Sequence, residues 1–126
     1  MTKESGPEKK LIRKFSEEIP YTQPCGPNCQ FGTLLPYRQT GDLNIGYVRM
    51  QGPTWNEVSA HTDWHQVYVM LNGKGRMLIG KQEHAVEAPC VIQIPYDTDH
   101  AMRVDEGEYV EYLYVNQMLK YEDEEN

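Results

Sequence analysis

Long apolar runs are missing from this sequence of 126 residues. A helix that spans a membrane needs about 20 consecutive apolar residues, so the chain contains no candidate span. Its first ten residues, Met1 to Lys10, are polar and charged and lack the apolar stretch of a signal peptide. We therefore expect a cytoplasmic protein that has no membrane partner.

Positive charge is also scarce. The chain has 12 Lys and Arg against 19 Asp and Glu, which gives a formal net charge of −7. Nucleic-acid binding needs a basic surface, so this composition argues against a nucleic-acid partner. Residues 1–10 are expected to be a disordered leader and residues 121–126, which hold four acidic side chains, a solvated tail. Residues 11–120 have the length of a single domain.

Cysteine is the third scarce component. The chain has three cysteines, Cys25, Cys29 and Cys90, and this odd number does not suggest a disulfide framework. In a cytoplasmic protein we expect the thiols to be reduced. Cys25 and Cys29 lie in a turn-rich loop, where a zinc or redox role is a minor alternative because no second pair accompanies them. The sequence gives no role for Cys90.

Short β-rich runs separated by Gly, Pro, Asn and Asp fill the chain from about Thr33 onward. This pattern predicts an all-β sandwich or barrel. Leu11 to Tyr21 fits a short helix and an edge strand equally well. Asn72-Gly73 and Gly80-Lys81 are each predicted to form a hairpin turn. The expected strands are 32–35, 43–50, 57–61, 66–71, 75–79, 84–87, 91–94, 101–104 and 109–115.

Three of the four histidines fall at two places in the sequence. His61 and His65 precede the predicted strand 66–71, and His100 follows the predicted strand 91–94. Each place couples possible metal ligands to a β-pattern and a turn, so side chains far apart in sequence could converge inside a barrel. Imidazole nitrogens bind Zn, Fe, Mn and Ni, and the histidines therefore predict a metal site.

The two segments resemble the two motifs of the cupin superfamily, whose members are double-stranded β-helix, or jelly-roll, barrels. Counting back from Gly73 places Gln66 at the position of the first motif's glutamate and His61 at that of its second histidine. His100 matches the histidine of the second motif. Ser59 stands where the first motif's other histidine is expected, so one normal ligand is missing.

The resemblance implies a small barrel that holds one divalent transition metal (Zn, Fe, Mn or Ni) through His61, Gln66 and His100. Successive side chains of a regular strand point to opposite faces, so only one of His65 and Gln66 can point inward. The count from Gly73 favours Gln66, whereas a β-bulge would turn His65 inward and give a three-histidine site. The candidate substrate-pocket residues are Ser59, Tyr68 and Met70.

For function, the resemblance implies a metal-dependent enzyme of the isomerase, lyase or cyclase type. Its substrate would be a small oxygenated metabolite such as a sugar acid or a carbonyl compound. An iron-dependent dioxygenase is an alternative if His65 joins the site. A non-catalytic small-molecule-binding or sensor barrel is an alternative from another class, and Ser59 favours it. We also expect a homodimer, because partner subunits often close open sheet edges.

Overall fold

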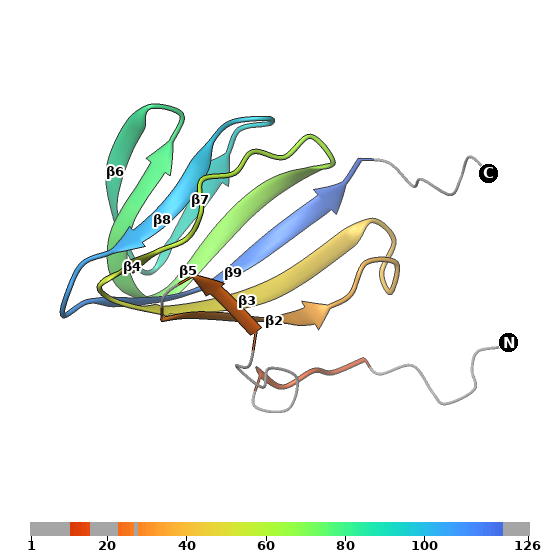
Figure 1. Ribbon diagram of the computed structural model, residues 1–126. Helices are drawn as coiled ribbons and strands as arrows, with labels where there is room; N and C mark the ends of the chain where they lie inside the picture. The colour runs from red at the N-terminus through yellow and green to blue at the C-terminus, as the bar shows by residue number, and fades with distance from the viewer. Residues whose placement is uncertain (1–10, 16–22, 27, 120–126) are drawn as a thin grey trace, which may run out of the picture.

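Figure 1 shows the computed structural model of the chain, in which residues 11–15, 23–26 and 28–119 are described. The predicted leader (1–10), the predicted tail (121–126) and most of the segment from Leu11 to Tyr21 lie outside these residues. No helix in the described part of the chain is long and apolar enough to span a bilayer.

The described residues form nine strands, and the all-β class that the sequence pattern predicted is confirmed. They are β1 (Gln23–Gly26), β2 (Cys29–Leu35), β3 (Leu43–Gln51), β4 (Thr54–Trp55), β5 (Trp64–Ile79), β6 (Gln82–Glu87), β7 (Cys90–Ile94), β8 (His100–Val104) and β9 (Tyr109–Met118). All pairs of neighbouring strands are antiparallel.

The strands form two curved layers that face each other (Figure 1). One layer follows the order β1-β2-β3-β9-β5, and β7 pairs with the other edge of β5. The second layer contains β6, β8 and β4 together with the second half of β5. The 16-residue strand β5 therefore belongs to both layers and joins them. This architecture is an all-β jelly-roll barrel.

The predicted hairpin at Asn72-Gly73 is wrong, because β5 runs through both residues without reversing. The favoured hairpin turn needs positive φ at both central residues, and Gly73 (φ 85°) has it whereas Asn72 does not. Instead, the register between β5 and β9 shifts between Met70 and Asn72, and this irregularity accompanies the passage of β5 from one layer to the other. A Cβ at Gly73 would lie 1.8 Å from the carbonyl oxygen of Tyr109, so only glycine fits.

The second predicted hairpin is confirmed, and one predicted strand is wrong. Ile79 pairs with Gln82 across the Gly80-Lys81 turn, which joins β5 to β6. By contrast, residues 57–61 form no strand, and only Ser59 makes an isolated bridge, to His100.

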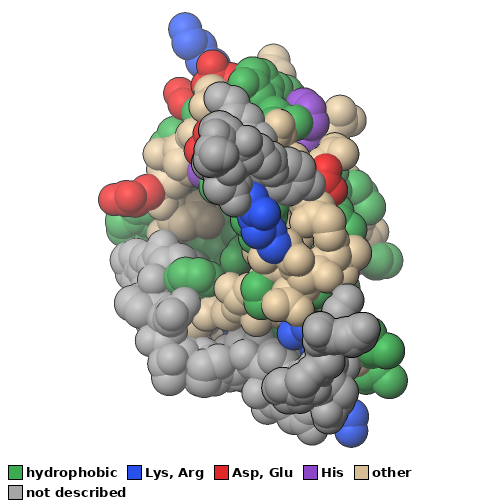
Figure 2. Space-filling view, turned by 90° about the vertical axis from the view of Figure 1, so that its right-hand side faces the viewer, with side chains coloured by type: hydrophobic (Ala, Val, Ile, Leu, Met, Phe, Trp, Pro, Cys, Tyr) green, Lys and Arg blue, Asp and Glu red, His purple; other side chains and the backbone are tan. Residues whose placement is uncertain are grey.

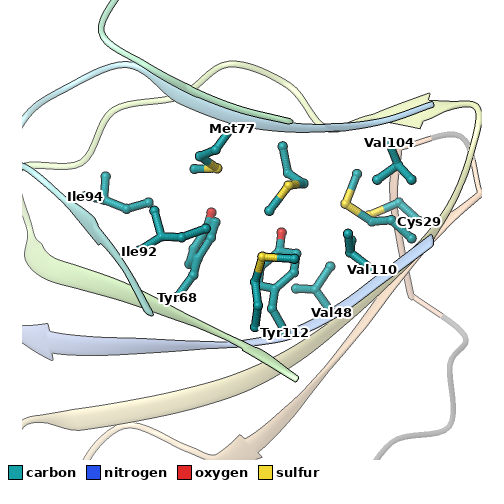
Figure 3. Close-up of a cluster of buried hydrophobic side chains, with 12 residues drawn as sticks. Cys29, Val48, Tyr68, Met77, Ile92, Ile94, Val104, Val110 and Tyr112 are labelled. Carbon is teal, nitrogen blue, oxygen red and sulfur yellow. The ribbon is translucent and has the colours of Figure 1, made fainter. Parts of the chain in front are cut away.

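The core lies between the two layers (Figure 3). It is rich in methionine, since Met50, Met70, Met77 and Met102 are all fully buried. Flexible thioether side chains fill irregular space well, which suits a barrel closed by two unequal sheets. The stacked rings of Tyr68 and Tyr112 rise from β5 and β9 toward the opposite layer.

One cysteine of this core departs from the sequence expectation. Cys29 is disulfide-bonded, so the prediction of reduced thiols is wrong for this residue. Cys90 is a free thiol, as expected.

Candidate metal and ligand site

The fold brings His61 and His100 together, although 38 residues lie between them in the sequence. Their ring centroids lie 5.1 Å apart, with the planes inclined by 59°. His100 begins β8, and its side chain is only 3% exposed. Backbone bonds hold the two segments: Ser59 and His100 exchange N–H···O bonds of 3.1 and 2.9 Å, and the N–H of Asp97 donates to the carbonyl of His61 at 3.0 Å.

The ring orientation of His100 is fixed by a backbone carbonyl. Its Nδ1 lies 3.0 Å from the carbonyl oxygen of Thr98. A carbonyl can only accept, so Nδ1 carries the hydrogen, and in the neutral form of this tautomer Nε2 has the free lone pair. Histidines that bind metals commonly donate their other N–H in this way, which sets the tautomer and the direction of the lone pair.

The environment of His61 favours the neutral imidazole. Its ring stacks on Trp64 with centroids 4.5 Å apart. Burial lowers the pKa of His61, and the nearby His100 lowers it further, whereas Asp63 raises it. Neutral imidazole is the form that donates a lone pair to a metal.

Gln66 points into the barrel and His65 points out of it. Gln66, Tyr68 and Met70 alternate inward along β5, and the side chain of Gln66 is 8% exposed. His65 is exposed on the outer face, where its ring and that of Tyr96 pack edge to face with centroids 5.7 Å apart. Gln66 therefore has the inward orientation that the count from Gly73 favoured, and His65, the alternative ligand, lies on the outer face of the strand.

A row of carboxamides crosses the sheet and orients Gln66. Asn44, Asn116 and Gln66 are paired across β3, β9 and β5. Asn44 Nδ2 donates to the carbonyl oxygen of Leu35 (3.2 Å), Asn116 Nδ2 donates to Asn44 Oδ1 (2.9 Å), and Gln66 Nε2 donates to Asn116 Oδ1 (2.8 Å).

This relay has a direction, because the carbonyl at its start can only accept. Each amide then turns its NH₂ toward the preceding member and its oxygen toward the next. At the end of the relay, Gln66 Oε1 is buried and has no hydrogen-bond partner. The relay therefore presents a bare acceptor oxygen, fixed in orientation, inside the barrel.

A cavity of about 320 Å³ lies at this end of the barrel. It is lined by Phe31, Asn44, Val48, Asn56, Trp64, Gln66, Tyr68, Tyr112, Tyr114 and Asn116. The beginnings of β3 and β5 and the end of β9 meet here, on the right of Figure 1. On this side of the molecule, shown in Figure 2, hydrophobic side chains lie among backbone and other side chains, and both acidic and basic side chains are visible. His61 and His100 are not lining residues, but they contact two of them, Trp64 and Tyr68.

The two buried phenols of the cavity stay protonated at neutral pH. Burial raises the pKa of Tyr68 to about 12, and a hydrogen-bonding interaction with Tyr112 offsets part of this rise. Burial also raises the pKa of Tyr112 well above its ordinary value. Their rings stack with centroids 4.5 Å apart, and Asn56 Nδ2 donates to the Tyr112 hydroxyl at 3.3 Å. The edge of Tyr68 faces His100, with centroids 6.1 Å apart.

The predicted pocket residues have three different positions. Tyr68 lines the cavity. Met70 is 1% exposed and belongs to the hydrophobic core instead. Ser59 is exposed and contacts the site through its backbone bridge to His100.

The sequence did not single out Asn44, Asn56 or Asn116 as site residues. A signal was present for Asn44, since asparagine is uncommon in strands and this one lies inside the predicted strand 43–50, whereas Asn116 lies one residue beyond the predicted strand 109–115. Asparagine at an inward position of a predicted strand indicates a buried hydrogen-bond network. Which side chains bond to one another in this network depends on the strand register, which the sequence alone did not provide.

The separation of the two imidazoles suits one divalent transition metal. With metal–nitrogen bonds of about 2.1 Å, two imidazoles on one tetrahedral ion have centroids about 5 Å apart, which agrees with the histidine pair. The buried, unpaired oxygen of Gln66 is a candidate third donor, on the strand that also carries Tyr68, whose ring packs against His100. Among the described residues, no group of three or more His, Cys, Asp or Glu could hold a metal, so a site here depends on two histidines and an amide.

Comparison with known proteins supports this architecture. The sequence matches no protein-family model and no curated protein. The structure is similar to a predicted oxalate decarboxylase from Thermotoga maritima, with a TM-score of 0.78 and 16% identity, covering 86% of this chain and 100% of that one. Cupin-2 barrel domain proteins are among the similar structures, and the fold is that of a small cupin barrel.

Two further cupin-like structures agree over most of the chain. A cupin-2 domain from Rhodospirillum rubrum has a TM-score of 0.71 and 14% identity, covering 93% of this chain and 80% of that one. A polyketide cyclase from Streptomyces resistomycificus has a TM-score of 0.69 and 14% identity, covering 90% of this chain and 86% of that one. At these identities, the likeness concerns the fold.

Proposed function

We propose that this cupin barrel is a metal-dependent enzyme of the isomerase, lyase or cyclase type that acts on a small oxygenated metabolite. His61, His100 and Gln66 would hold one divalent transition metal such as Zn, Fe, Mn or Ni. The observation that carries the proposal is the buried, partnerless oxygen of Gln66 together with two imidazoles at a separation that suits one ion. Two similar structures support this reaction type, since one is described as a predicted oxalate decarboxylase and the other as a polyketide cyclase.

The chemistry follows from the donor set. When bound, a divalent ion with three neutral ligands keeps its full charge and polarises a carbonyl or hydroxyl oxygen. The carbonyl of Thr98 holds the lone pair of His100 in position, and the amide relay does the same for Gln66 Oε1. Tyr68 remains a neutral hydrogen-bond donor beside His100, because its pKa is raised to about 12. Fixed ligands and a cavity wall in which no described side chain is charged favour chemistry at one oxygen of the substrate.

The proposal is tested by metal content and by exchange at an acidic C–H. We expect about one transition metal per chain in tag-free protein, and loss of the metal in His100→Ala. The matched control is His65→Ala, which removes an exposed histidine four residues from His61 and should leave the metal in place. With 2-tetralone in D₂O as a neutral carbonyl probe, metal-loaded protein should accelerate deuterium exchange at the carbon next to the carbonyl, and His100→Ala should not.

The second candidate, a non-catalytic binding or sensor barrel, is favoured by one feature of the cavity. Its wall contains no carboxylate, imidazole or amine among the described residues, and these are the usual general acids and bases. A protein that binds the probe without accelerating exchange, in the presence of each candidate ion, would establish this second reading and contradict the enzymatic one.

A further inference from the structure

The cavity beside the histidine pair has an uncharged and largely aromatic wall. Five of its ten lining residues are aromatic, four are carboxamides and one is valine, so none of the described residues in the wall carries a charge. An ionised group placed against such a wall loses its hydration and gains no partner of opposite charge. The body of a bound ligand should therefore be neutral.

The polar atoms of this wall are mostly occupied by each other. Asn44 and Asn116 are engaged in the relay, and Asn56 donates to Tyr112 while its oxygen accepts the backbone N–H of Met102 at 2.8 Å. A sugar carries a hydroxyl on nearly every carbon and needs a partner for each one. This wall has few free partners to offer a sugar.

Two lining residues do carry a buried polar atom that has no partner, Trp64 Nε1 and Gln66 Oε1. The indole N–H is a donor only, and the amide oxygen is an acceptor only. Gln66 Oε1 is the proposed metal ligand, which leaves Trp64 Nε1–H to be satisfied by the ligand. An oxygen acceptor on the ligand would remove the cost of this buried, unpaired donor.

We propose that the cavity binds a neutral, flat ring compound that carries a keto or phenolic oxygen, and that Trp64 Nε1–H donates to an oxygen of this compound. The inference names the substrate class of the proposed enzyme and so rests on the proposed function. It also selects carbonyl and phenolic compounds over sugar acids. At about 320 Å³, the cavity is near the lower end of the usual range for ligand pockets, about 300 to 1,000 Å³, which suits one or two fused rings.

The test uses 2-naphthol, its anionic analogue 2-naphthoate, and the sugar acid gluconate, each titrated at pH 7 into ¹⁵N-labelled protein with and without metal. The chain has two tryptophans, so each indole N–H gives its own NMR signal. Trp55 is the internal control, since it is exposed on β4 and lines a different cavity. We expect 2-naphthol to shift the Trp64 indole signal saturably and to leave Trp55 in place.

In metal-free protein, we expect 2-naphthoate to bind about tenfold more weakly than 2-naphthol or worse, and gluconate to cause no shift. Trp64→Phe keeps an aromatic ring and removes the donor, so it should weaken 2-naphthol binding by about five- to tenfold, with Trp55→Phe as the matched control. The inference is overturned if 2-naphthol gives no saturable shift up to millimolar concentration, if either anion binds metal-free protein as tightly, if Trp55 responds in place of Trp64, or if Trp64→Phe binds unchanged.

These outcomes separate the inference from the proposed function. Binding of 2-naphthol at Trp64 by a protein that takes up no metal would support the inference and refute the metal-dependent enzyme. Tight metal binding together with a preference for gluconate would refute the inference and leave the enzyme proposal standing.

Discussion

The amide relay makes a sharp prediction about Asn116→Asp. Asn116 is 4% exposed, accepts from Gln66 Nε2 and donates to Asn44 Oδ1. A protonated aspartic acid can make both bonds, because its O–H donates to Asn44 and its carbonyl oxygen accepts from Gln66. An ionised carboxylate has no hydrogen to donate, so two acceptors would face each other in a buried place.

The magnitude and its pH dependence follow from this geometry. Burial and the facing acceptor oxygen raise the pKa of the new carboxyl in the folded state above its value in the unfolded chain, about 3.9. Its contribution to stability is then fully present below the unfolded pKa and is lost as the pH rises through the folded pKa. Each unit of difference corresponds to about 1.4 kcal/mol. We expect the variant to approach wild-type stability near pH 4 and to be less stable by about 3 kcal/mol near pH 7.5.

The assay is denaturant unfolding of Asn116→Asp and wild type at pH 4 and pH 7.5. The matched control is Gln117→Glu, which introduces a carboxylate on the same strand at an exposed position and should change stability by only a few tenths of a kcal/mol at either pH. If Asn116→Asp tracks wild type at both pH values, or changes with pH no more than Gln117→Glu, the direction assigned to the relay is refuted.

Three further predictions concern the backbone, the phenols and the core. In denaturant unfolding, Gly73→Ala should destabilise the fold by about 3 kcal/mol or more, because a Cβ there would overlap a backbone carbonyl. Gly107 has a similar φ of 86°, but no atom lies within 4 Å of a Cβ built there, so Gly107→Ala should cost about 1 kcal/mol. The pKa of Tyr68 is raised to about 12, so this residue should make no pH-dependent contribution to the free energy of unfolding below about pH 10. About 3 kcal/mol of stabilisation should be lost as the pH rises through 12. An ultraviolet titration that finds every phenol ionised at pH 10.5 in folded protein would contradict this. Met77→Ala should lower the free energy of unfolding by about 2 to 5 kcal/mol, because the side chain is fully buried, and a loss below 1 kcal/mol would show that the core repacks around it.

The local pattern of the sequence predicted much of the fold. Alternating runs located most strands, and the Gly80-Lys81 turn was correct because a two-residue connection with glycine leaves few other geometries. The count from Gly73 correctly turned Gln66 inward, since the side-chain period of a strand is strict. The hairpin predicted at Asn72-Gly73 was wrong, because a glycine with positive φ occurs at a bend within a long strand as well as in a turn between two strands.

The site was predictable only in part, for a physical reason. The histidine spacing indicated His61 and His100, and the structure brings them together. The relay depends on the pairing of β3 with β9 and of β9 with β5, in which one step of register would turn each amide to the opposite face. Strand pairing over such distances is decided by the packed barrel as a whole, so Asn44 and Asn116 could not be joined to Gln66 from local patterns.

The passage of β5 through both layers has a consequence for how the barrel opens. Its first half is hydrogen-bonded to β9 and β7, and its second half to β6 and β8. Neither layer can separate without breaking bonds of this one strand, so the two sheets should unfold as a single cooperative unit rather than as independent halves. The amide hydrogens of β5 should therefore be among the slowest in the chain to exchange with solvent, and Gln66, carried on that strand, should share the global stability of the fold.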